Sequence, residues 1–286
     1  MNFQPKLKEV EMKNMVKNIC AAMVISLCAA GHLSATENNP NNDNKFMEEN
    51  LNLTQEWGKT FPQSDKVDHK KITFHNRYGI TLAADLYVPK NVTGKLPAIA
   101  ISGPFGAVKE QASGLYAQTL AERGFLTIVF DPSYTGESSG QPRYVASPDI
   151  NTEDFSAAVD YLSTRDDVDA ERIGILGICG WGGMALNAAA IDTRIKATVT
   201  ATMYDMSRVN ANGYFDSMNA DARHELRRQL NAQRTEDYRN GTFALGGGVV
   251  DPLPADAPQF VKDYHAYYKT PVSYTHLRAH ETSQDL

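Results

Sequence analysis

Residues 177–183 read GICGWGG and follow directly on the apolar run RIGIL of residues 172–176. A strand that leads into a nucleophile flanked by glycines, with a helix behind it, is the layout of a nucleophile elbow. The turn in such an elbow is so tight that residues beside the nucleophile need to be small. The segment therefore predicts that a strand–turn–helix unit presents the thiol of Cys179. The residues expected to give it room are Gly177, Gly180, Gly182 and Gly183.

Buried strands and helices alternate on both sides of this segment. Continuous apolar runs predict strands, and helical periodicity between them predicts crossover helices, which together indicate a mostly parallel sheet with helices on both faces. A hairpin, with a turn at residues 76–79, is expected before them. The predicted strands are 70–74, 80–88, 96–102, 125–131, 172–178 and 195–203, and the predicted helices are 111–124, 151–165 and 182–190.

Composition and charge exclude several classes of protein. The 286 residues are 42% hydrophobic and 22% charged, as in an ordinary globular protein. A formal net charge of −6 without any Lys/Arg-rich stripe argues against nucleic-acid binding. No stretch is long enough for a membrane-spanning helix.

The first 35 residues have the layout of a secretory signal peptide. Lys13 and Lys17 precede an apolar stretch at residues 19–30, and cleavage is expected after Ala35, with Met1 or Met12 as the start. Export to the periplasm or the exterior is therefore expected. Residues 36–66 read as a linker with one short helix near 47–57.

Removal of that leader would leave Cys179 as the single cysteine of the three in the chain. The helix behind the elbow points its amino end at the sulfur, which favours the thiolate and lowers its pKa by about one unit. The Gly180 N–H is placed to donate to a developing oxyanion. A second donor is expected from residues 103–106, GPFG, where Pro104 has no N–H and the candidates are Phe105 and Gly106.

These motifs, in this order, resemble the α/β-hydrolase superfamily in its dienelactone-hydrolase-like branch. The matching stretches are NRYGITLAADLYVPK (76–90), GPFGAVKEQ (103–111), FDPSYTGESSGQPR (130–143) and GICGWGG (177–183). The resemblance implies an eight-stranded, mostly parallel sheet, a Cys–His–Asp triad in chain order and hydrolysis of an ester, lactone or similar acyl bond. We expect no cofactor and no metal.

The chain departs from that pattern at two positions. Relatives often carry His where Gly103 stands, and Trp181 occupies a place that usually holds a small residue, which would narrow or reshape the pocket. Glu137 could line the site, although a simple turn is the favoured interpretation of its segment. Asp205 follows the strand at 195–203, where some members place the triad acid; the ordinary alternative is a carboxylate at the entrance of a lid.

The carboxyl-terminal part shows no partner for the thiol. A small cap is expected at about 205–268, with a polar helix pair at 215–238 and an exposed His224. Residues 272–286 resemble a translated sequencing adapter, so the natural domain is expected to span 67–271 with its last strands missing. His276 and His280 of that tail have no strand context for a base or a metal site.

The sequence therefore predicts an exported hydrolase of acyl bonds that acts on a small-molecule substrate, poorly active in this truncated form. The alternatives are a non-catalytic binding protein of the same fold and an inactive fragment. Neither the substrate nor the oligomeric state can be read from the residues.

Overall fold

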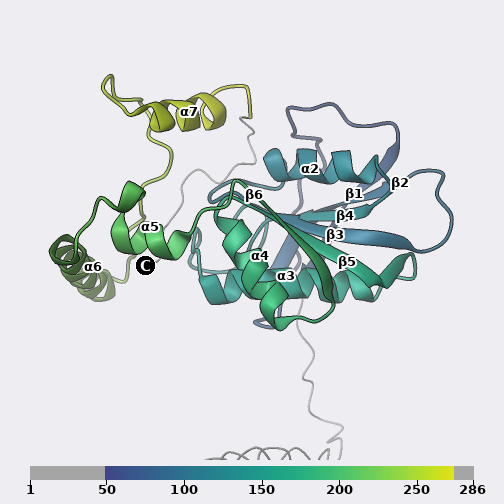
Figure 1. Ribbon diagram of the computed structural model, residues 1–286, viewed down its shortest axis with the longest axis horizontal. Helices are drawn as coiled ribbons and strands as arrows, with labels where there is room; N and C mark the ends of the chain where they lie inside the picture. The colour runs from purple at the N-terminus through teal and green to yellow at the C-terminus, as the bar shows by residue number, and fades with distance from the viewer. Residues whose placement is uncertain (1–48, 274–286) are drawn as a thin grey trace, which may run out of the picture. The chain divides into compact units, whose positions relative to one another are not determined.

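A single six-stranded sheet organises the computed structural model, which describes residues 49–273. The strand order is β1-β2-β4-β3-β5-β6 (Figure 1). β1 pairs antiparallel with β2 and β2 with β4, whereas β4, β3, β5 and β6 run parallel. The strands are β1 (Val67–His75), β2 (Thr81–Pro89), β3 (Leu96–Ser102), β4 (Leu126–Phe130), β5 (Val168–Ile178) and β6 (Ile195–Ala201).

The helices alternate with the parallel strands, as the periodicity predicted. α2 covers one face of the sheet, and α3 and α4 cover the other (Figure 1). The prediction of a mostly parallel sheet with helices on both faces is confirmed. The helical elements are α2 (Ala112–Ala121), α3 (Pro148–Ser163), α4 (Gly180–Ile191), α5 (Met206–Asn212), α6 (Ala220–Asn240) and α7 (Gln259–Tyr268), with a short 3₁₀ turn, η2 (Tyr214–Asp216).

The predicted hairpin is also confirmed. Asn76 closes its turn, because its side-chain oxygen accepts from the N–H groups of Tyr78 and Ile80 at 3.0 Å each. Alternate residues of β2 then face opposite sides of the sheet. Leu82 and Leu86 join the core beneath α3 and α4, while Tyr87 joins the core beneath α2.

The segment that precedes β1 differs from the prediction. Residues 49–57 contain no helix, and residues 49–66 form irregular chain that packs partly against the sheet. The Nζ of Lys59 lies 2.9 Å from Asp85 of β2, and both side chains are fully buried. The same ammonium lies 4.2 Å from the centre of the Trp57 ring. The local periodicity of this segment is weak, and the tertiary contacts of Trp57 and Lys59 therefore hold it as irregular chain rather than as a helix.

The predicted cap region holds α5, η2, α6 and α7. The polar helix pair expected at 215–238 is wrong, because α6 is one 21-residue helix that begins after the Asn219 cap. The Asn219 side chain accepts from the Ala222 N–H at 2.9 Å, which satisfies one of the free donors at the helix start. No residue of α6 is buried, and His224 is exposed as predicted.

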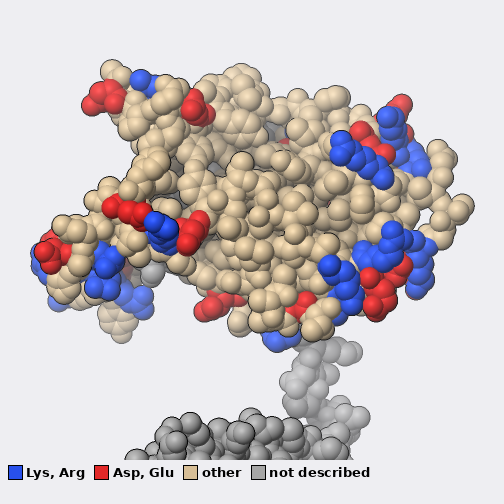
Figure 2. Space-filling view, viewed as in Figure 1, with Lys and Arg blue, Asp and Glu red and all other residues tan. Residues whose placement is uncertain are grey.

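The strand β6 forms the end of the described sheet. Its only neighbour among the described strands is β5, and Val199 on it is 54% exposed. Ile191, at the end of α4, is 73% exposed. Few charged side chains lie over β6 and α4 in Figure 2, where Lys, Arg, Asp and Glu gather toward the two ends of the view. The predicted leader at 1–35 and residues 274–286 of the predicted tail lie outside the described residues.

One buried carboxylate ties three parts of the fold together. Asp154 of α3 accepts from the N–H and hydroxyl of Ser133 at 2.9 and 2.7 Å. It also accepts from the side-chain amides of Asn76 and Asn151 at 2.9 and 3.0 Å. The hairpin turn, the loop after β4 and the start of α3 are thereby joined at one side chain.

Replacing Asp154 with Ala should lower the free energy of unfolding by roughly 3 kcal/mol, because several buried donors lose their acceptor. Urea unfolding followed by circular dichroism measures the loss. Asp149→Ala is the matched control, since Asp149 lies exposed in the first turn of the same helix and should cost less than about 1 kcal/mol. Equal losses in the two variants would contradict this role of Asp154.

Candidate active site

Cys179 occupies the single position between the end of β5 and the start of α4. Its backbone has φ 57° and ψ −125°, a sparsely populated conformation for a residue with a side chain. The surrounding backbone holds it there: the Cys179 N–H donates to the Ala201 carbonyl at 2.9 Å, and the Cys179 carbonyl accepts from Gly182 at 3.1 Å. The strand–turn–helix elbow predicted from the sequence is present.

The glycines around the thiol have unequal roles. A Cβ on Gly177 would lie 2.3 Å from the Trp181 carbonyl oxygen, and a Cβ on Gly180 would lie 1.9 Å from the Phe105 ring. At Gly182 it would meet Met203 at 2.8 Å. Gly183 has nothing within 4 Å of such an atom, so the expectation that it gives room to the elbow is wrong.

Two backbone donors converge on the sulfur. The N–H groups of Gly180 and Phe105 both hydrogen-bond to the Cys179 thiol and thereby favour its ionised form. Gly180 is the oxyanion donor expected from the sequence, and Phe105 is one of the two candidates, with Gly106, for the second donor. Their convergence at the thiol places them beside any carbonyl carbon that the sulfur could attack.

The thiol is nevertheless not activated in the way the sequence suggested. Burial raises the pKa of Cys179 above its ordinary value, and the two backbone hydrogen bonds offset only part of that rise. The prediction of a pKa lowered by the start of α4 is therefore wrong, because removal of the thiolate from water outweighs the helix end.

The loop after β3 is pressed against the elbow. A Cβ on Gly103 would lie 2.3 Å from the Ile178 carbonyl oxygen, and the φ of Gly103 is 122°. A histidine, which relatives often carry there, would not fit this backbone. The Trp181 indole is only 2% exposed and meets the Phe105 ring edge-on, with centroids 4.5 Å apart. Trp181 is thus accommodated in the core beneath the elbow, next to the loop after β3 at residues 103–109, which we call the oxyanion loop after its expected donor.

Within the described residues, no carboxylate or imidazole acts on the Cys179 thiol. Asp205 is exposed and caps α5, where it accepts from the Arg208 N–H at 2.9 Å. His69 lies 3.1 Å from Asp85, and His265 lies 3.6 Å from Asp251. Within residues 49–273, no imidazole hydrogen-bonds to the Cys179 sulfur. The role of Asp205 as an acid stays a prediction.

Glu137 belongs to a buried ionic cluster, which we define as Lys71, Lys109, Glu110, Asp131 and Glu137. The Lys109 ammonium lies 2.9 Å from Asp131, 2.9 Å from Glu110 and 2.6 Å from Glu137. Burial works against ionisation of Glu137, but the charge and hydrogen bond of Lys109, with the hydrogen bonds of Lys71 and Thr54, lower its pKa to about 2. Its segment forms the predicted turn.

The ionic cluster was missed by the sequence reading. It anchors the oxyanion loop, because Asp131 accepts from the Lys109 N–H at 2.8 Å as well as from the ammonium. The signal lay in the sequence as charged residues at the ends of two neighbouring apolar strands, the GAVKE and FDPSYTGE stretches. Parallel strands bring such ends to one edge of the sheet.

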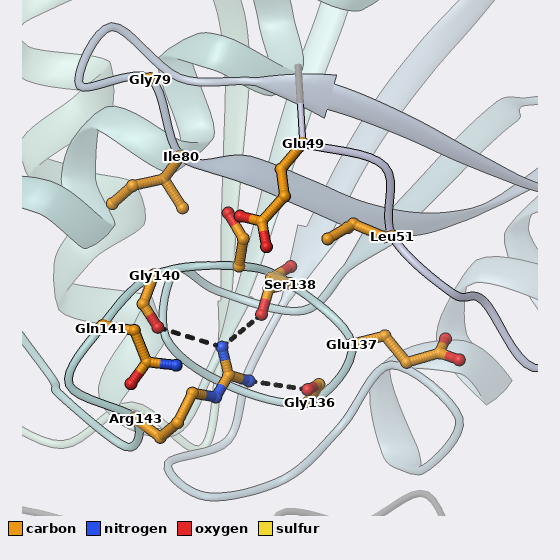
Figure 3. Close-up of a pocket in the computed structure, with 11 residues that line it drawn as sticks. Glu49, Leu51, Gly79, Ile80, Gly136, Glu137, Ser138, Gly140, Gln141 and Arg143 are labelled. Carbon is orange, nitrogen blue, oxygen red and sulfur yellow. Dashed lines mark hydrogen bonds between the residues drawn. The ribbon is translucent and has the colours of Figure 1, made fainter. Parts of the chain in front are cut away.

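A separate hollow of about 490 Å³ lies between the hairpin turn and the loop after β4. Figure 3 shows Arg143 at its base, with its guanidinium turned toward the backbone carbonyls of Gly136, Ser138 and Gly140. Those carbonyls accept hydrogen bonds from Arg143, so the guanidinium serves to brace the loop. Cys179 does not line this hollow.

Neither a membrane span nor a metal cluster emerges from the part of the chain that the structure describes. None of its helices combines the length and apolar character needed to cross a bilayer. In that same part, no three His, Cys, Asp or Glu side chains gather in a way that could hold a metal ion.

An elbow cysteine at the carboxyl edge of this sheet, with two backbone donors facing it, is the arrangement of an α/β hydrolase. The solved structure of the α/β hydrolase GrgF from Penicillium sp. sh18 has the same fold, with a TM-score of 0.59 at 20% identity over 74% of this chain and 69% of that one. The predicted relationship to the α/β-hydrolase superfamily is confirmed.

Within that class, residues 78–252 match the family described as X-Pro dipeptidyl-peptidase (S15 family), and the chain belongs to this family. An uncharacterized Pseudomonas aeruginosa protein, PA2218, is 59% identical over 260 residues, which are 91% of this chain and 68% of PA2218. Its crystal structure matches with a TM-score of 0.79 at 61% identity over 83% of this chain and 74% of that chain. The thiohydrolase aneE of Aspergillus aculeatus is 29% identical over 137 residues, 48% of this chain and 42% of aneE.

The raised pKa of Cys179 predicts a shifted reactivity profile. Iodoacetamide labels the thiolate, so the midpoint of the labelling rate against pH should lie above about 8.5 in the folded chain and near it in urea. Mass spectrometry of the peptide that contains Cys179 measures the rate at each pH. A folded-state midpoint below that of the unfolded chain would show that the thiol is activated instead.

Proposed function

We propose that the protein is an acyl hydrolase in which Cys179 is the nucleophile. The observation that carries the proposal is the convergence of the Gly180 and Phe105 N–H groups on a thiol held at a strained elbow. That is the combination of attacking atom and oxyanion donors that acyl transfer requires. The family relationship to hydrolases and the thiohydrolase name of aneE agree with it.

The reaction divides into two steps. The Cys179 thiolate attacks the acyl carbonyl carbon, the carbonyl electron pair moves to oxygen, and the two N–H groups stabilise that oxyanion. When the intermediate collapses, the bond to the leaving group breaks and the leaving group departs with the electron pair. Water then attacks the acyl-cysteine and releases the carboxylic acid and the thiol.

The surroundings of the thiol favour substrates with good leaving groups. No imidazole in residues 49–273 hydrogen-bonds to the sulfur and could protonate a departing alkoxide. A thiolate or phenolate leaves without such help because its conjugate acid has a pKa near 8 to 10, by analogy with about 8.5 for Cys and about 10 for Tyr. Thioesters and aryl esters are therefore the proposed substrate bonds, within the ester and lactone class.

The second candidate is a non-catalytic binding protein of the same fold. The raised pKa of Cys179 favours it, since a half-buried thiol that stays protonated is a weak nucleophile. The two candidates differ in whether an activated ester leaves an acyl group on the sulfur.

Mixing the full chain with 4-nitrophenyl acetate should give a burst of about one equivalent of nitrophenolate and an acetylated Cys179. Cys179→Ala should abolish both, as read by stopped-flow absorbance and intact mass. The matched control is the double variant Cys20→Ala, Cys28→Ala, which keeps the burst if Cys179 is the reacting residue. An unreactive wild-type thiol would overturn the hydrolase proposal in favour of the binding protein.

We further propose that the protein is exported, from the leader pattern of residues 1–35. Expressed from Met1 or Met12 in a Gram-negative host, the product should appear in the periplasmic fraction with Thr36 as its first residue. Amino-terminal sequencing reads this directly. Replacing Val24 and Ile25 of the apolar stretch with Asp should retain the uncleaved chain in the cytoplasm, whereas an uncleaved wild-type chain there would refute export.

A further inference from the structure

Five aromatic rings from three parts of the cap region form a continuous set, which we call the ring set. Three of them, Phe260, Tyr264 and Tyr268, recur every four residues along α7 and therefore lie on one side of that helix. The other two are Tyr204, just after β6, and Tyr214 of η2. Only the α7 spacing is visible in the sequence; the meeting of the five rings is a product of the fold.

Each ring of the set touches the next. Centroid separations are 6.3 Å for Tyr204 and Tyr214, 5.4 Å for Tyr214 and Phe260, 6.4 Å for Phe260 and Tyr264, and 6.3 Å for Tyr264 and Tyr268. The hydroxyls of Tyr204 and Tyr264 share a hydrogen bond of 2.9 Å, which links the segment after β6 directly to α7. Two of the four contacts are edge-on, one is tilted and one is stacked, and these separations are those of favourable aromatic contacts.

The ring set begins at the elbow itself. The Tyr204 N–H donates to the Cys179 carbonyl at 3.4 Å. The first residue of the ring set is therefore hydrogen-bonded to the backbone of the elbow. The tyrosines of the set also sense the charge of the thiolate. Burial, then the charge of Tyr204, then that of Cys179 raise the pKa of Tyr214, and the Cys179 charge contributes to the raised pKa of Tyr264 and Tyr268.

Part of the ring set remains open to solvent. Tyr214 is 46% exposed and Phe260 is 41% exposed, whereas Trp181 below the elbow is buried. A closed core would cover such rings, so part of their area is open to contact from solvent. The area is apolar and built from aromatic faces and edges, and its polar atoms are phenolic hydroxyls, two of which already bond to each other.

We propose that the ring set is the acyl-group subsite and that the substrates of Cys179 carry an aromatic ring in their acyl part. The proposal rests on the proposed function, because the subsite is defined relative to the attacking sulfur. An acyl group that carries an aromatic ring gains edge and face contacts with several rings at once, whereas an acetyl group is too small to cover them. Phe260 and Tyr214 act as specificity-determining residues, and the Gly180 and Phe105 donors remain common to all substrates.

The test compares acylation by 4-nitrophenyl phenylacetate and by 4-nitrophenyl acetate, each corrected for its uncatalysed hydrolysis. The phenylacetyl group should acylate Cys179 about tenfold faster, and Phe260→Ala should reduce that preference about tenfold. The matched control is Phe215→Ala, since Phe215 is 95% exposed and is not in the ring set. It should retain the wild-type preference. Equal acylation rates for the two esters in the wild type would overturn the proposal.

A second measurement separates the subsite from the chemistry. In the Cys179→Ala variant, saturation-transfer NMR should detect binding of the S-methyl thioester of phenylacetic acid but not of the S-methyl thioester of acetic acid. Binding without any wild-type acylation would support the subsite while refuting the cysteine nucleophile. Acylation without ring preference would refute the subsite alone, and absence of both would refute each proposal.

Discussion

The close approach of two strand ends is the constraint on which this structure depends. β3 and β5 run side by side and parallel, with Ser102 paired to Gly177, so the next residues of both strands meet at the edge of the sheet. There Gly103 lies so near the Ile178 carbonyl that no Cβ fits between them. The contact sets the oxyanion loop against the elbow, and the Phe105 N–H reaches the Cys179 sulfur as a result. The site is thus a consequence of backbone packing before any side-chain chemistry.

The buried ionic cluster holds the other end of the same loop. Desolvation of Lys109 works against its charge, but the carboxylates of Asp131, Glu110 and Glu137 raise its pKa well above the ordinary value. Such a buried cluster costs much solvation energy and is weak evidence for net stability, yet removal of one partner would leave an uncompensated charge. Its contribution here is geometric: Lys109 and Asp131 join the loop after β3 to the loop after β4, so both carboxyl-edge loops are held in place.

Much of this could be predicted from the sequence, and the failures have physical causes. Apolar runs and glycines predicted the hairpin, the parallel strands and the elbow, because those patterns depend on local geometry. The helix expected near residues 47–57 is absent from residues 49–57, the part that the structure describes, because Lys59 and Trp57 follow tertiary contacts. The prediction of a lowered pKa for Cys179 was wrong, because burial raises this pKa and burial is a property of the folded chain. The ring set could not be predicted, because Tyr204 and Tyr264 are 60 residues apart in the chain and only the fold brings them together.

The resting site also imposes an order on the chemistry. The Gly180 and Phe105 N–H groups bond to the sulfur, and they are the same groups that an oxyanion would need. In the proposed reaction the negative charge of the attacking sulfur moves to the carbonyl oxygen, so the two donors can follow the charge with little reorganisation. A thiol with a raised pKa then depends on substrate binding to exclude water and to position the carbonyl. Binding energy from a group beside the elbow would therefore appear in the rate of acylation as well as in affinity.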